Sequence, residues 1–211
     1  MKTIDLFRNF RLMALLFSAI AIVSCSDDDD APEEENDEET ITDVTLVFTN
    51  TADANDVVRA SAEDPDGEGV QELQVLDAIT LSTDTEYTLT FEIENALDPN
   101  DVEDIAAEIA GEDDEHQFFF SFTEGVFSNP TGNGNVDTAS DPINYNDEDS
   151  ENQDGSGNPV GLSTSWTTSS TAFTGGTFVA RLQHQPDIKS ATTGAGDGDA
   201  DFNLTFVLNI E

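Results

Sequence analysis

Basic side chains are scarce in this sequence. Six Lys and Arg residues stand against 46 Asp and Glu residues, which gives a formal net charge of −40 over 211 residues. Affinity for nucleic acids comes largely from Lys and Arg side chains that release counterions from phosphate groups. A chain this acidic repels phosphate, which excludes nucleic-acid binding and, by charge alone, adhesion to an anionic membrane surface.

Cysteine is rarer still, with a single residue at position 25. A disulfide needs two cysteines and a thiolate metal cluster needs more, so one chain can form neither. A long apolar run is also lacking. The N-terminal run has 12 residues, 12–23, whereas a transmembrane helix needs about 20, so this run is too short to remain as a span.

Recognisable catalytic motifs are missing too. The sequence contains no Gly-x-Ser-x-Gly turn, and its two histidines, His116 and His184, have no nucleophile at a recognisable spacing. Acidic residues are so numerous that no pair stands out as a glycosidase dyad. We therefore expect a non-enzymatic protein and treat a secreted hydrolase as the least favoured alternative.

The N-terminal segment 1–24 has the three parts of a secretory signal: a basic start, the apolar run, and the small residue Ser24 before Cys25. Residues 22–25 resemble the lipobox of bacterial lipoproteins, which implies that Cys25 is acylated, for example with palmitate, and begins the mature chain. The next five residues resemble the surface-export signal of Bacteroidetes lipoproteins: Ser26, Asp27, Asp28, Asp29 and Asp30. We expect a protein that contacts the outer membrane through its lipid and faces the cell surface.

An acidic linker follows the cysteine. Ten of the thirteen residues at 27–39 are acidic, and none is a large apolar residue. Such a stretch cannot bury a core and repels itself, so we assign residues 25–40 to an extended, lipidated tether. The chain after residue 24 has 45 acidic and three basic residues, a net charge of −42. Outside the linker, we expect these charges on a solvated surface.

From residue 41 onward, apolar and polar residues alternate with a period of two, which is typical of half-buried β-strands. Turn motifs rich in Gly, Pro, Asp and Asn separate the alternating segments. The pattern predicts a mainly β fold: a single antiparallel β-sandwich of Ig-like type at 41–211, with a long loop at 128–159. The expected strands lie at 44–49, 57–62, 70–81, 87–94, 117–122, 160–168, 177–185 and 202–210.

One segment follows the helical spacing i, i+3, i+4 and i+7 instead, at Val102, Ile105, Ala106 and Ile109. Asn100 or Asp101 would cap its N-terminus, and Gly111 fits a C-terminal stop. We predict one short helix near 101–110.

Five segments give the chain a distinctive order of features: residues 25–29, 41–48, 113–118, 181–186 and 198–206. In this order the chain resembles, over nearly its full length, a group of small Bacteroidetes (flavobacterial) surface lipoproteins of poorly defined role. Such proteins are sometimes labelled type 1 periplasmic-binding-fold proteins. That fold alternates strands with helices on both faces of a sheet. This sequence predicts only one helix, which favours the sandwich. The resemblance implies an outer-membrane TonB-dependent receptor as partner.

The two histidines are expected at one rim of the sandwich. His116 shares its strand phase with core phenylalanines, and His184 shares its phase with Leu182, so antiparallel pairing would bring both imidazoles together. With Asp187 and residues 113–115 close by, they form a candidate site for zinc, copper or iron. The alternative is that each histidine closes a core face and hydrogen-bonds a loop carbonyl.

Calcium is the other candidate ion, because it binds several oxygen ligands on a flexible turn. Acidic, Gly-rich loops occur at 64–69, 147–155 and 197–201, and none matches the EF-hand pattern. Plain solvated turns have the same composition and are the alternative. The second loop has the most oxygen ligands, among them Asp147, Asp149 and Asp154.

Taken together, these observations predict a surface-exposed outer-membrane lipoprotein that acts as a binding or accessory module, with a TonB-dependent receptor as the partner that the resemblance implies. A metal-binding accessory lipoprotein, using either the histidine site or a calcium loop, is the alternative.

Overall fold

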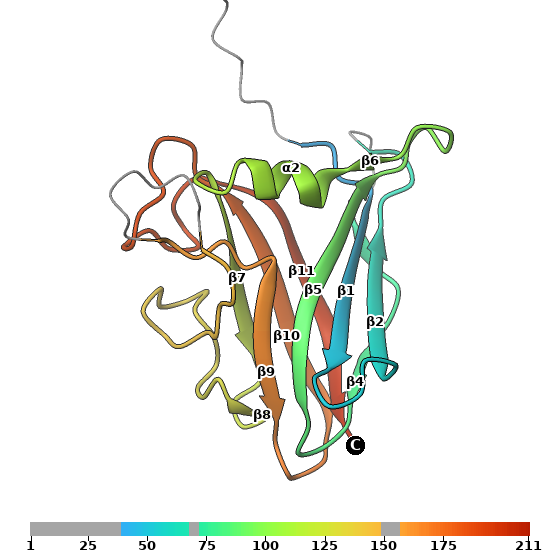
Figure 1. Ribbon diagram of the computed structural model, residues 1–211, viewed down its shortest axis with the longest axis vertical. Helices are drawn as coiled ribbons and strands as arrows, with labels where there is room; N and C mark the ends of the chain where they lie inside the picture. Colours follow the sequence, from blue (N-terminus) through green and yellow to red (C-terminus); the bar gives the residue numbers. More distant parts are fainter. Residues whose placement is uncertain (1–38, 68–71, 149–156) are drawn as a thin grey trace, which may run out of the picture. The chain divides into compact units, whose positions relative to one another are not determined.

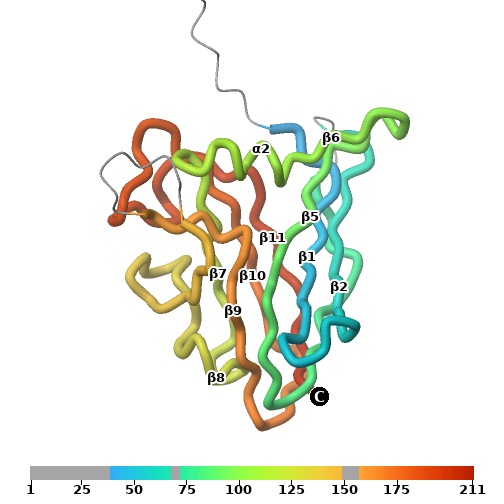
Figure 2. The backbone as a smooth tube through the Cα atoms, in the orientation of Figure 1, coloured from blue at the N-terminus to red at the C-terminus, as the bar shows by residue number. Residues whose placement is uncertain are grey.

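The computed structural model describes residues 39–67, 72–148 and 157–211. The expected signal segment, Cys25, the export signal at 26–30, and Asp149 and Asp154 therefore lie outside the described residues. Within them, two β-sheets face each other and enclose the apolar core, as Figures 1 and 2 show. This confirms the predicted β-sandwich. The described part of the chain contains no helix that could span a membrane.

The larger described sheet runs in the order β3-β2-β1-β5-β9-β8, with β6 paired to β5. All its pairings are antiparallel. Its strands are β1 (Asp43–Asn50), β2 (Val57–Glu63), β3 (Gln74–Val75), β5 (Glu86–Asn95), β6 (Glu103–Asp104), β8 (Phe127–Asn129) and β9 (Ser163–Thr168).

The second described sheet runs in the order β4-β11-β10-β7. The long strands are antiparallel, and short β4 is parallel to β11 at one edge. Its strands are β4 (Ile79–Leu81), β7 (His116–Phe122), β10 (Phe173–His184) and β11 (Asp199–Ile210).

The expected strand at 70–81 is wrong as a single element. Residues 70 and 71 lie outside the described residues, and the rest forms two short strands that join different sheets, β3 and β4. Leu76 between them is 57% exposed, and Asp77 accepts hydrogen bonds from the backbone N–H and the hydroxyl of Ser61. The chain therefore leaves one sheet at this point and crosses to the other.

The predicted helix exists as α2 (Ile105–Gly111), but it begins later than expected. Residues Glu103 and Asp104 pair with β5 as β6, and Asp104 is the N-cap whose carboxylate accepts the N–H of Ala107. Val102 consequently lies before the helix and is 47% exposed. Ile105 and Ile109 are buried, so α2 closes one end of the sandwich (Figure 1).

Aromatic side chains dominate the core between the sheets. Trp166 is fully buried and lies within 5.5 Å, between ring centroids, of Phe120, Phe122, Phe127 and Phe178. Each such ring buries a large apolar area, and edge-to-face pairs add about 0.5–1.5 kcal/mol beyond that burial. These contacts join β9 and β8 of one sheet to β7 and β10 of the other.

The loop that follows β8 lies along β7 (Figure 2), and a backbone bridge joins Gly134 of the loop to Ser121. Tyr145 donates a hydrogen bond to the carbonyl of Phe118 at 2.6 Å and accepts one from Asn135 at 2.9 Å. Ile143 and Tyr145 pack against the core, as their isolated apolar character predicts, and Val136 is half-buried. The described part of this loop is therefore tied to the sandwich.

Candidate functional site

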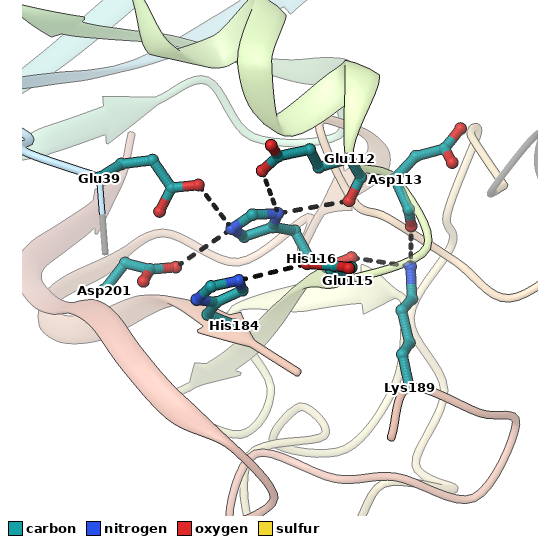
Figure 3. Close-up of polar contacts among 8 residues, drawn as sticks. All are labelled: Glu39, Glu112, Asp113, Glu115, His116, His184, Lys189 and Asp201. Carbon is teal, nitrogen blue, oxygen red and sulfur yellow. Dashed lines mark hydrogen bonds and ion pairs between the residues drawn. The ribbon is translucent and has the colours of Figure 1, made fainter. Parts of the chain in front are cut away.

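Four segments of the chain bring acidic and histidine side chains together at the end of the sandwich closed by α2. Figure 3 shows Glu39 ahead of β1, His116 at the start of β7, His184 at the end of β10, and Asp201 near the start of β11. Each offers one ligand atom, and these four atoms all lie within 4.8 Å of one another. We call these four residues the His/carboxylate cluster.

The two histidines meet as the strand phase predicts. His116 and His184 are directly opposite each other in the antiparallel pair β7 and β10. Their rings stack with centroids 4.6 Å apart and planes 3° from parallel. The prediction that both imidazoles share one rim is confirmed, because opposite residues in an antiparallel pair point to the same face of the sheet.

Asp201 reaches the cluster through a β-bulge. Leu182 pairs with Phe202, but the next residue of β10, Gln183, pairs with Ala200, so Asp201 is an extra residue in β11. A bulge turns a side chain away from the face that strict alternation would give it. The Asp201 carboxylate is 1% exposed and lies 3.8 Å from Nε2 of His116. Strand phase alone gives no sign of this position.

Glu39 was also missed, because it ends the acidic run that we assigned to a tether. Its side chain is 8% exposed, and its Oε1 lies 3.0 Å from Nε2 of His116. The folded part therefore begins before residue 41, since Glu39 belongs to the site and not to a solvated linker. Among the many acidic residues of that run, nothing in the sequence distinguishes Glu39.

Two residues of the connection between α2 and β7, Glu112 and Glu115, contact ring nitrogens of the histidines and orient the rings. Nδ1 of His116 lies 3.3 Å from the carbonyl oxygen of Glu112, and Nε2 of His184 lies 3.5 Å from the carboxylate of Glu115. A hydrogen on Nδ1 of His116 leaves the lone pair on Nε2, which faces Glu39 and Asp201 (Figure 3). Histidine ligands of metals usually have an outer partner of this kind.

Lys189 holds that connection in place. Its ammonium group donates hydrogen bonds to the carbonyl oxygens of Asp113 and His116, the latter at 2.7 Å. It is one of the three basic residues after position 24. By joining the loop after β10 to the start of β7, Lys189 fixes the backbone from which His116 projects.

Electrostatics at the cluster favour a charged His116. Burial opposes the imidazolium, but Glu39, Asp201 and the Glu112 carbonyl outweigh burial and raise the pKa of His116 above its usual value. Burial likewise opposes ionisation of Glu39, but the attraction of the histidines outweighs it, and the pKa of Glu39 is lowered. Burial and the nearby charge of Glu39 raise the pKa of Glu112.

The other expected ligands are not part of this cluster. Asp187 is exposed in the turn after β10, where its φ of 60° belongs to a tight reversal of the chain. Asp147 uses its two carboxylate oxygens to accept the N–H groups of Gly161 and Ser163, at 2.9 and 3.0 Å. Asp149 and Asp154 lie outside the described residues, so the calcium site in that loop stays a prediction.

The donor set fits a transition-metal ion better than calcium. Two imidazoles and two carboxylates suit zinc, copper or iron, whereas calcium prefers six to eight oxygens. Ligands of a tetrahedral zinc ion are about 3.4 Å apart at bond lengths near 2.1 Å. The contact of 3.0 Å between Glu39 and His116 is close to this value, and the most distant atoms, within 4.8 Å, would move inward by roughly 1 Å.

Comparisons of the chain with protein-family models, with curated proteins and with solved structures gave no match.

Proposed function

We propose that this protein binds a divalent transition-metal ion, zinc in the first place, through Glu39, His116, His184 and Asp201, as a lipid-anchored accessory protein of the outer membrane. The observation that carries the proposal is the meeting of four ligand atoms from two histidines and two carboxylates within 4.8 Å of one another. Oε1 of Glu39 and Nε2 of His116 face each other at 3.0 Å, beside a second imidazole and a second carboxylate.

Such an arrangement is unfavourable without a positive charge between the groups. With its hydrogen on Nδ1, His116 presents a lone pair at Nε2, which repels the lone pairs of a carboxylate. Buried polar atoms are normally hydrogen-bonded, yet Oε2 of Glu39 has no hydrogen-bond partner, and Oε1 of the same carboxylate lies 3.0 Å from Nε2 of His116. A metal ion would satisfy these atoms together.

A proton on Nε2 of His116 is the competing explanation, and the raised pKa of His116 agrees with it. A proton would relieve the contact with Glu39. It would not account for the second imidazole and the second carboxylate, His184 and Asp201, whose ligand atoms lie within 4.8 Å of this pair. The two explanations are distinguishable by experiment. Metal binding releases protons from the ligands, whereas a cluster that holds a proton and binds no metal ion releases none when metal is added.

The location and partner belong to the same proposal. Lipidation of Cys25 and the acidic residues that follow it would hold the protein at the cell surface. There, a metal-binding module without catalytic activity would serve a neighbouring receptor, and the resemblance to surface lipoproteins supports a TonB-dependent receptor in that role.

Isothermal titration calorimetry with Zn²⁺ tests the proposal on protein stripped of metal with a chelator. We expect one ion per chain and release of protons, measured as a dependence of the binding heat on the buffer. The variant H116A/H184A should lose this binding. The variant Glu124→Gln, which changes an exposed carboxylate beyond the far end of β7, should bind like the parent.

Two outcomes would contradict the proposal: no zinc binding by the parent protein, or zinc binding that survives unchanged in H116A/H184A. A parallel titration with Ca²⁺ separates the two kinds of site. Calcium binding that persists in H116A/H184A would place that ion at the acidic loops, away from the His/carboxylate cluster.

A further inference from the structure

A cavity of about 270 Å³ lies directly beside the His/carboxylate cluster. Its described walls come from residues 39–41 before β1, from residues 64, 67, 72 and 73, and from the start of β11. Two of the four cluster residues, Glu39 and Asp201, line it, whereas His116 and His184 do not. The two carboxylates therefore lie between the cavity and the imidazoles.

The imidazoles themselves are closed to solvent. The side chains of His116 and His184 are 0% and 5% exposed, so an ion cannot reach them directly from bulk water. Oε2 of Glu39 is a buried acceptor that has no hydrogen-bond partner, on a side chain that lines the cavity. This oxygen is suited to receive a cation arriving through the cavity before the imidazoles do.

Two further carboxylates, Asp64 and Glu72, also line the cavity. Asp64 is 6% exposed and uses Oδ1 to accept the N–H of Asp66 at 3.1 Å, and Glu72 is exposed. Lys and Arg are missing from the described residues that line the cavity. Apolar side chains such as Leu73 and Phe202 make up part of the wall and lower the local dielectric, which strengthens the field of the carboxylates.

We propose that this cavity is the entrance through which a hydrated divalent cation reaches the cluster, with Asp64 and Glu72 as positioning residues that hold the cation on the way. The inference rests on the metal-binding function proposed above. The cation exchanges its water ligands first for carboxylate oxygens of Glu39 and Asp201 and then for the ring nitrogens behind them. Single-sign charge in a cleft raises association rates by 10-fold to 1,000-fold, and salt weakens the effect.

Stopped-flow mixing of the metal-free full chain with Zn²⁺, in competition with a coloured chelator, measures the rate of uptake. The test variant is Asp64→Asn with Glu72→Gln. Asparagine keeps an oxygen that can accept the N–H of Asp66, and Glu72 is exposed, so the fold should persist. The matched control is Glu86→Gln with Glu124→Gln, which removes the same charge at the opposite end of β5 and β7.

We expect the association rate of the test variant to fall at least about threefold below that of the control at low ionic strength, and the difference to shrink at high salt. The melting temperature and the number of ions bound should equal those of the control. Equal uptake rates in the two variants would overturn the entrance while leaving the metal site in place. No zinc uptake by the parent protein would overturn both proposals. The single variant Glu72→Gln serves as a second test should the double variant unfold.

Discussion

At the scale of single residues, buried polar groups in this protein are used in two different ways. In the His/carboxylate cluster, Oε2 of Glu39 is buried without a hydrogen-bond partner, and this is part of the basis for the proposed metal site. At Tyr145 the polar group is fully satisfied, because the hydroxyl donates to the carbonyl of Phe118 and accepts from Asn135. The cluster thus has unused hydrogen-bonding capacity, whereas Tyr145 connects the long loop to β7.

Tyr145 gives a prediction about pH. Burial is the main cause that raises its pKa to about 12, since phenolate would be poorly solvated there. A raised folded-state pKa contributes stability that is fully present below the unfolded value of about 10 and is lost as the pH rises toward 12.

Ultraviolet titration of phenolate in a Tyr87→Phe variant isolates Tyr145, the other of the two tyrosines. We expect a midpoint near 12 while circular dichroism still shows the folded state. The variant Tyr145→Phe should lack the transition. A midpoint near 10 in the folded protein would show that the hydroxyl is solvated and that the loop does not pack as described.

At the scale of secondary-structure elements, the junction of β10 and β11 decides whether the site forms. The bulge at Asp201 and the pairing of His184 with Asp199 both depend on the close approach of the chain just before β11. Gly198 has a φ of 79°, and a Cβ at this position would overlap the carbonyl oxygen of His184. Glycine is needed there for both its conformation and its size.

Replacing Gly198 with alanine should therefore displace the end of β10 and weaken zinc binding by at least about tenfold, an effect comparable to loss of an outer partner of a metal ligand. Calorimetry measures the affinity. Gly196→Ala is the matched control, because nothing lies within 4 Å of a Cβ built at Gly196. If both alanine variants bound zinc equally well, the geometry of this junction would not set the site.

At the scale of the whole molecule, the folded part and its attachment are separate questions. The sandwich accounts for residues 39–211 apart from the two short gaps, and it carries the site and the cavity. The N-terminal residues carry the predicted lipidation site and surface-export signal. Lipid anchoring is durable only with more than one acyl chain, because each buried CH₂ contributes about 0.8 kcal/mol and one chain binds reversibly.

Replacing Cys25 with serine removes the expected acylation site and should leave the protein soluble or unprocessed. Incorporation of labelled palmitate and membrane fractionation measure the outcome. A Cys25→Ser protein that is still labelled and still sediments with the outer membrane would disprove the lipoprotein assignment.

Replacing all four residues from Asp27 to Asp30 with asparagine should leave labelling intact and reduce digestion by external protease. Unchanged digestion would contradict the surface-export assignment alone.

Alternation of polar and apolar residues was sufficient to predict the sandwich and the meeting of His116 with His184. Strand phase specifies a face, and antiparallel pairing makes opposite residues neighbours. The same reasoning failed for the strand at 70–81 and for the first turn of the helix. Short segments there are decided by which sheet edge is free to pair, and local sequence does not report this.

The sequence by itself determined the fold class, the acidic surface, the predicted lipidation site and surface-export signal, and the pair of histidines, because each depends on composition or on spacing within one segment. Only the tertiary structure decided which carboxylates complete the cluster. Glu39 and Asp201 are 162 residues apart in a chain with 46 acidic residues. The segment before β1 brings Glu39 to His116, and a bulge in β11 brings Asp201 there. Both positions arise from packing between distant segments.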